Sequence, residues 1–277
     1  MNEFEKIQRD PVSRRAFLQR MGAAGLGVAA VSMLQGCGGG SSSSSGNGNN
    51  NGSRFPISVP GKTDNIKILN YALTLEILEA DLYRQALNLA TGRAPGADLD
   101  ASPSSYTPDS GVSNLGVLDA AGFAYLRDFA YVEAAHRDFL STTISSLGDT
   151  PVLRNPKGYA FVTTPAKNLR AILQALLPLE ETGVRAYLGA SAYFVDFPAS
   201  AGLVQAAVGI YSTEARHSAA IQYVLGNDIG PNGNEAGVPA SLKLNGLPYE
   251  DKGLGDTFEY FATPDQVIRA VAPFFVK

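Results

Sequence analysis

The chain has 277 residues, of which 45% are hydrophobic and 17% charged, so it can bury a sizeable core and is not a disordered polymer. Its 22 Lys and Arg against 26 Asp and Glu give a formal net charge of -4 and no basic stripe, so we expect no nucleic-acid partner. The single cysteine excludes an internal disulfide framework, a cysteine-rich zinc site and an iron–sulfur cluster.

The first 37 residues have the features of an export signal. Residues 13–19, Ser-Arg-Arg-Ala-Phe-Leu-Gln, resemble the twin-arginine export motif, with Arg14 and Arg15 as the arginine pair. Residues 21–34 form a mildly apolar stretch rich in Gly and Ala, shorter than the about 20 residues that a membrane-spanning helix needs. Basic residues followed by a short apolar stretch are typical of a signal peptide, so we expect the twin-arginine export machinery to be a partner.

The signal ends in a sequence that is similar to a bacterial lipobox. Residues 34–37 are Leu-Gln-Gly-Cys, and in signals of this kind the peptide is cut before the cysteine, which then carries lipid. We therefore expect an exported protein of the periplasm or cell envelope that is anchored to a membrane by lipid on Cys37. The alternative is that Cys37 is an ordinary free thiol in a loop. Residues 38–63 begin with a tract of Gly, Ser and Asn, which predicts a flexible tether.

Four long segments with helical periodicity follow the tether. They cover residues 64–90, 115–147, 164–193 and 200–225. Thr63 or Asp64 is the expected cap of the first helix, and Thr164 is the expected cap of the third. The sequence contains no alternating strand pattern of useful length. These features predict an all-α fold with two helical hairpins in a four-helix bundle over residues 64–226, and a mostly irregular extension over 227–277 with a short helix at 264–272.

Polar residues interrupt the apolar stripes of the second and fourth helices. Glu133 and His136 lie on the inward face of one, and Glu214 and His217 lie on the inward face of the other. Both histidines of the chain thus stand three residues after a glutamate. Because a buried carboxylate or imidazole is unfavourable without a partner, a repeated Glu-x-x-His pair in a buried stripe indicates a metal site.

The first and third helices carry matching carboxylates. Glu76 and Glu180 each interrupt an apolar stripe, and each is followed seven residues later by a tyrosine, Tyr83 and Tyr187 respectively. The two hairpins therefore have the pattern of two copies of one unit. Facing each other, they would bring four carboxylates and two imidazoles to one point.

This donor set predicts a dinuclear metal centre whose ligands are Glu76, Glu133, His136, Glu180, Glu214 and His217. Four carboxylates and two neutral imidazoles balance the charge of two divalent cations, which offsets the cost of burying the carboxylates. Mixed oxygen and imidazole ligation suits two Fe or two Mn ions, and Zn is a further alternative.

Four other polar residues are expected near this centre. Glu79 and Glu181 flank the stripes, so we expect them either beside the ligands or in solvent. Tyr83 and Tyr187 are expected to be either core aromatics or hydrogen-bond partners of the ligands. No catalytic residue can be assigned from the sequence.

One Glu from each of two helices together with Glu-x-x-His from the other two resembles the di-iron carboxylate pattern of the ferritin-like superfamily. Residues 75–80 (Leu-Glu-Ile-Leu-Glu-Ala), 179–184 (Leu-Glu-Glu-Thr-Gly-Val) and 186–189 (Ala-Tyr-Leu-Gly) are similar to its exported branch, which includes plant and bacterial desiccation-related proteins. The resemblance covers residues 64–226 and implies a ferritin-like four-helix bundle.

The resemblance implies an exported protein whose di-iron or di-manganese centre has a redox or oxidative-stress role, such as Fe(II) oxidation or peroxide removal. The rival hypothesis is a non-enzymatic envelope or desiccation-related protein with a vestigial or structural metal site. Iron storage in a closed cage is hard to reconcile with a lipid anchor and a long C-terminal extension. A homo-oligomer of another kind is still possible from the sequence. An internal rubrerythrin-like electron chain is excluded because the sequence has no Cys-x-x-Cys.

Overall fold

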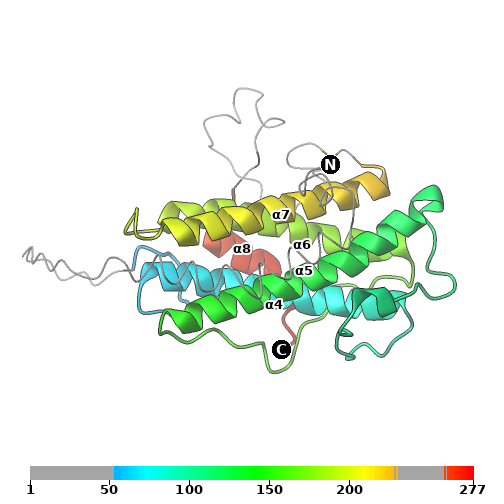
Figure 1. The fold of residues 1–277 in the computed structure, drawn as a ribbon, viewed down its shortest axis with the longest axis horizontal. Coiled ribbons are helices and arrows are strands. Elements are labelled where there is room, and N and C mark those ends of the chain that lie inside the picture. The colour runs from blue at the N-terminus through cyan, green and yellow to red at the C-terminus, as the bar shows by residue number, and fades with distance from the viewer. Residues whose placement is uncertain (1–52, 228, 230–258, 260) are drawn as a thin grey trace, which may run out of the picture.

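The computed structural model describes residues 53–227, 229, 259 and 261–277 (Figure 1). In this part of the chain it contains five α-helices, several short 3-10 turns and no strand. The helices are α4 (Asp64–Ala90), α5 (Asp119–Ser146), α6 (Leu169–Ala190), α7 (Ala201–Leu225) and α8 (Pro264–Val271). The predicted all-α bundle is therefore confirmed. The export motif with Arg14 and Arg15, the lipobox with Cys37 and most of the predicted tether lie outside the described residues.

The four long helices form two hairpins. Helix α4 packs mainly on α5 and α6 mainly on α7, and the hairpins meet through α4 against α6 and α5 against α7. Figure 1 shows the four helices running side by side along the long axis of the molecule. One continuous apolar core fills the space between them, because the predicted stripes of all four helices point inward.

Two of the predicted helix starts are wrong. Helix α6 begins at Leu169, not Thr164, because the side chain of Asn168 caps it by accepting a hydrogen bond from the Ala171 amide at 2.8 Å. The Leu169 amide donates to the carbonyl of Val112, so the preceding segment is held to the loop between α4 and α5.

Helix α5 begins at Asp119, after a 3-10 turn at Gly116–Leu118, rather than at residue 115. Gly116 has a φ of 64°, which an α-helix does not allow, so the chain cannot enter the helix before this point. Helix α6 also ends earlier than residue 193, since Ser191–Tyr193 form a separate 3-10 turn.

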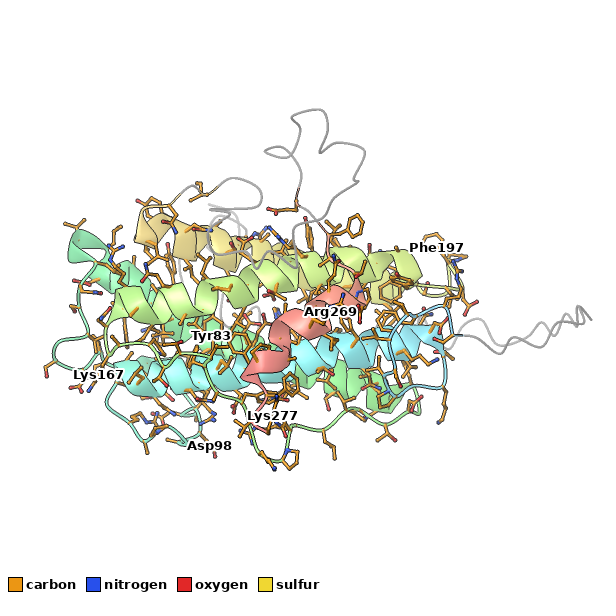
Figure 2. All side chains as sticks on the ribbon, turned by 180° about the vertical axis from the view of Figure 1, so that it is seen from behind. Tyr83, Asp98, Lys167, Phe197, Arg269 and Lys277 are labelled. Carbon is orange, nitrogen blue, oxygen red and sulfur yellow. The ribbon has the colours of Figure 1, made fainter. Side chains whose placement is uncertain are left out.

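The C-terminal segment packs against the outside of the bundle. Helix α8 begins with a capping box formed by Thr263 and Gln266, and it contacts α6. Seen from behind, it crosses over α4 and α6 (Figure 2). The chain comes so close to α6 that a Cβ atom on Gly189 would lie 1.8 Å from the carbonyl oxygen of Ala262, so only glycine fits there. The prediction of a short helix in an otherwise irregular extension places this helix correctly.

None of the helices among the described residues has the length and apolarity that a bilayer-spanning helix requires.

Candidate metal centre

The structure brings all six predicted ligands to one point halfway along the bundle. Each of the four long helices contributes at its middle: α4 provides Glu76, α6 provides Glu180, and the Glu-x-x-His pairs come from α5 and α7. The four carboxylates are 0% exposed and His217 is 3% exposed, while the His136 side chain retains 15% exposure. The sequence forces this burial because each residue continues a stripe that is otherwise apolar.

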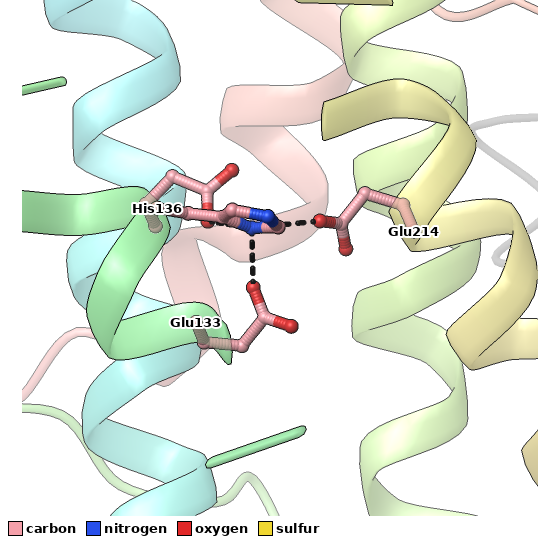
Figure 3. A group of neighbouring side chains, drawn as sticks. Glu133, His136 and Glu214 are labelled. Carbon is pink, nitrogen blue, oxygen red and sulfur yellow. Dashed lines mark hydrogen bonds and ion pairs between the residues drawn. The ribbon is translucent and has the colours of Figure 1, made fainter. Parts of the chain in front are cut away.

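One half of the cluster surrounds His136. Its Nδ1 atom lies 3.1 Å from Oε2 of Glu133, 3.3 Å from Oε2 of Glu76 and 3.3 Å from Oε1 of Glu214. Figure 3 shows the imidazole in contact with the carboxylate of Glu133, from its own helix α5, and with that of Glu214, from α7. Three carboxylates thus converge on one imidazole nitrogen.

The other half surrounds His217. Its Nδ1 atom lies 2.8 Å from Oε1 of Glu133 and 3.4 Å from Oε2 of Glu180. Glu133, Glu180, Glu214 and His217 form one group whose donor atoms all lie within 4.8 Å of one another, and Glu76, Glu133, His136 and Glu214 form a second. Each group could hold a metal ion, and the two groups share Glu133 and Glu214.

Comparison with known proteins agrees with this arrangement. Residues 64–227 match the ferritin-like domain family, a range that covers more than half of the chain. The chain belongs to the ferritin-like domain family. No curated protein matches its sequence.

Most donor atoms of this ferritin-like domain are held close together without a hydrogen bond, although Glu133 Oε2 and His136 Nδ1 form one at 3.1 Å. Buried oxygen or nitrogen atoms lack a hydrogen-bond partner among the described residues on most of the ligands, namely Glu76 Oε2, Glu133 Oε1, Glu180 Oε2, both carboxylate oxygens of Glu214, and His217 Nδ1. Unpartnered buried polar atoms are rare because each costs free energy. Atoms of five ligands that all remain unpartnered around one point are what a shared cation requires.

The electrostatics of the ferritin-like domain without metal are unfavourable. Burial and the neighbouring carboxylates raise the pKa of Glu214 well above its usual value, and burial also raises the pKa of Glu76. Burial acts to raise the pKa of Glu133 too, but the two imidazoles outweigh it and hold this pKa below its usual range. The carboxylates therefore compete for the little positive charge that two imidazoles can supply.

The two tyrosines connect the hairpins crosswise. Tyr187 of α6 donates its hydroxyl hydrogen to Oε1 of Glu76 on α4 at 2.5 Å, and Tyr83 of α4 donates to Oε1 of Glu180 on α6. Burial raises the pKa of both phenols well above 10, so each hydroxyl keeps the proton that it donates. Each tyrosine thereby fixes one carboxylate oxygen and leaves the other, the unpartnered Oε2, for the centre.

Glu79 and Glu181 are both buried, so the expectation that they could lie in solvent is wrong. Helix geometry gives the angle of a side chain from the stripe but not the space that the facing helix leaves. A Cβ atom on Gly183 would lie 3.4 Å from Oε1 of Glu79 and 3.2 Å from Oε2 of Glu214, so the glycine makes room for both carboxylates. Glu181 points elsewhere, where it accepts a hydrogen bond from the Ser218 hydroxyl.

The role of Phe129 was missed by the sequence analysis, although Phe129 lies on the stripe of α5 one turn before Glu133. Its ring stacks on the imidazole of His217, with centroids 3.7 Å apart and an interplanar angle of 23°. The edge of Tyr83 also contacts Phe129, at 6.4 Å between centroids. Phe129 therefore holds the ring of His217 in the orientation that directs Nδ1 at the carboxylates, a packing role that no sequence motif indicates.

Proposed function

We propose that this ferritin-like protein holds a dinuclear iron or manganese centre and uses it to react with dioxygen or peroxide, in Fe(II) oxidation or peroxide removal. The observation that carries the proposal is the pair of four-donor groups that share Glu133 and Glu214. Sharing of two carboxylates between adjacent groups is suited to two ions bridged by those residues. Zinc would fit the donor types too, but it would give no redox reaction.

Each ligand has a distinct part in this proposal. Glu133 and Glu214 would bridge the ions, Glu76 and His136 would complete one group, and Glu180 and His217 the other. A bound pair of redox-active ions supplies the electron transfer to dioxygen or peroxide that carboxylates and imidazoles cannot perform. Tyr83 and Tyr187 orient the outer carboxylates, and the surrounding apolar core limits the access of water.

The charges of the site support two divalent ions rather than one. Four buried carboxylates carry four negative charges when ionised, and two divalent cations balance them with both imidazoles neutral. A single ion would leave two buried negative charges uncompensated. Such charges are unfavourable in a site whose four carboxylates are fully buried and whose most exposed candidate ligand, His136, has a side chain only 15% exposed.

The proposal is tested on the purified protein by loading it anaerobically with Fe(II), counting bound metal, and recording the optical spectrum before and after exposure to dioxygen. We expect two ions per chain and a new absorption in the near ultraviolet when dioxygen is added. Two ions with no spectral change in either dioxygen or peroxide would favour the rival function, a metal-stabilised envelope protein without activity. No bound metal under any loading condition would contradict the dinuclear centre itself.

We also propose that the protein is exported and acts in the periplasm or cell envelope. Replacing Arg14 and Arg15 together by lysine is expected to leave the precursor in the cytoplasm, because the twin-arginine machinery recognises the arginine pair. Fractionation of cells that express the variant, with Lys6→Arg as a control for charge, measures this directly. Normal export of the double variant would rule out this route.

Lipid on Cys37 is the proposed anchor. Cys37→Ser is expected to move the mature protein from the membrane fraction to the soluble fraction. The reason is that several acyl chains hold a protein firmly at a membrane, and the variant would carry none. Metabolic labelling with a fatty acid should mark the wild type and not the variant. If both distribute equally to membranes, the anchor lies elsewhere.

A further inference from the structure

A small apolar cavity, partly open to solvent, lies between the helices of the bundle near the metal centre. Its lining comes from α4, α5, α6, α7 and the segment after α6, and consists of Ala, Ile, Leu and Phe side chains apart from two tyrosines. Several of the lining residues are alanines, among them Ala186 and Ala207, and their small side chains leave space unfilled.

The cavity lies close to the candidate ligands, although none of them lines it. Leu75, in its wall, precedes Glu76 in α4, and Leu140 lies one helical turn after His136 in α5. Tyr187, which also lines the cavity, donates its hydroxyl hydrogen to Glu76. A molecule in the cavity would therefore contact Tyr187, whose hydroxyl bonds to the Glu76 carboxylate.

The size and chemistry of the cavity restrict what it can hold. The volume of the cavity is about 10 Å³, which is room for one very small molecule. A buried water needs two to four polar partners. The lining offers two hydroxyls, the fewest that could hold a water: Tyr187 has already donated its hydrogen, and Tyr71 is buried with no partner among the described residues. The rest of the lining is apolar, and apolar cavities bind molecules such as xenon.

We propose that this cavity is a binding site for one small apolar gas molecule, and that its occupant in the working protein is dioxygen. The identification of dioxygen rests on the proposed function, while the apolar binding site rests on the cavity alone. Binding here would place dioxygen beside the helical turns of α4 and α5 that carry candidate ligands. The small residues at Ala186 and Ala207 keep the space open.

Xenon is the probe that tests the site independently of any metal. Crystals of the purified, metal-free protein under xenon pressure should show anomalous scattering from one atom between Leu75, Leu140 and Tyr187. The variant Ala207→Leu should lose it, because the longer side chain fills the space, and Ala207 is only partly buried and can accept the change. The control Val208→Leu, at the next and mostly exposed position, should retain it. An empty cavity under xenon, or an ordered water in its place, would overturn the binding site.

A kinetic comparison tests the occupant. In the iron-loaded protein at limiting dioxygen, Ala207→Leu should oxidise several-fold more slowly than Val208→Leu, while oxidation driven by hydrogen peroxide should be equal in both. Should xenon bind in the wild type but the dioxygen rates of the two variants be equal, the assignment of dioxygen is wrong. If the loaded wild type reacts with neither oxidant, the proposed function fails, and the xenon result still decides whether the apolar site exists.

Discussion

Glu133→Ala and Glu214→Ala are each expected to abolish binding of both metal ions, whereas His136→Ala and His217→Ala should each remove one. The reason is that Glu133 and Glu214 belong to both groups of donors, while each histidine belongs to one. Loss of a shared carboxylate takes a donor from both groups and leaves three carboxylates to balance two divalent cations. Metal per chain, measured after anaerobic Fe(II) loading and removal of excess metal, distinguishes the two classes of variant.

Two other glutamates provide the matched controls. Glu181→Ala removes a carboxylate that is as buried as the ligands but bonds to Ser218, so it should leave the metal content at the wild-type value. Glu79→Ala should lower metal affinity less than any ligand variant, because Glu79 faces Glu214 across the space at Gly183 and belongs to neither group. A larger loss of metal in Glu79→Ala than in Glu76→Ala would overturn the ligand assignment.

The long helices and the six candidate ligands were within reach of the sequence because both depend on periodicity. A stripe at helical spacing predicts which residues face inward, so the Glu-x-x-His pairs and the two further glutamates fall on one buried line in each helix. The repeat of Glu76 and Tyr83 in Glu180 and Tyr187 also predicted a pseudo-symmetric pair of hairpins. It did not predict that each tyrosine bonds to the glutamate of the other hairpin.

What the sequence did not predict depends on contacts between distant segments. The start of α6 is set by the local cap of Asn168 together with bonds from Leu169 and Arg170 to the loop between α4 and α5, and these longer-range bonds are recorded by no local pattern. The burial of Glu79 depends on Gly183 in a different helix. The packing of the C-terminal segment depends on the close approach of Gly189 and Ala262, which are 73 positions apart in the sequence. Propensity and periodicity carry no information about such pairs.

Removal of metal is expected to destabilise the protein at neutral pH by an amount that is easily measured. A ligand present at a hundred times its dissociation constant stabilises the folded state by about 2.7 kcal/mol. For a domain of this size, each ion bound under that condition should raise the Tm by about 5–10 °C. Calorimetry of the loaded and metal-free forms at equal protein concentration measures the difference.

The same experiment repeated across pH gives a more specific result. Burial and neighbouring carboxylates raise the pKa of Glu79 and Glu214 well above 4.5 in the metal-free fold, so the folded state binds protons more tightly than the unfolded state. Their contribution to stability is thus present below about pH 4.5 and is lost as the pH rises through their folded pKa values. Burial lowers the pKa of His136 and His217, but the facing carboxylates outweigh it and raise the net pKa, so their contribution is also lost with rising pH.

Among the groups of the centre with a shifted pKa, Glu133 acts in the opposite direction. Its pKa is lowered by the two imidazoles against the effect of burial, and its contribution is lost as the pH falls below about 4.5. The Tm of the metal-free protein should therefore decrease from about pH 5 to about pH 8. Over the same range the Tm of the loaded protein should change far less, because cations neutralise its carboxylates. Glu214→Gln keeps the shape of the side chain without its charge, so it should flatten the profile of the metal-free form. A metal-free protein that gains stability over this range would show that the carboxylates are not the groups in conflict.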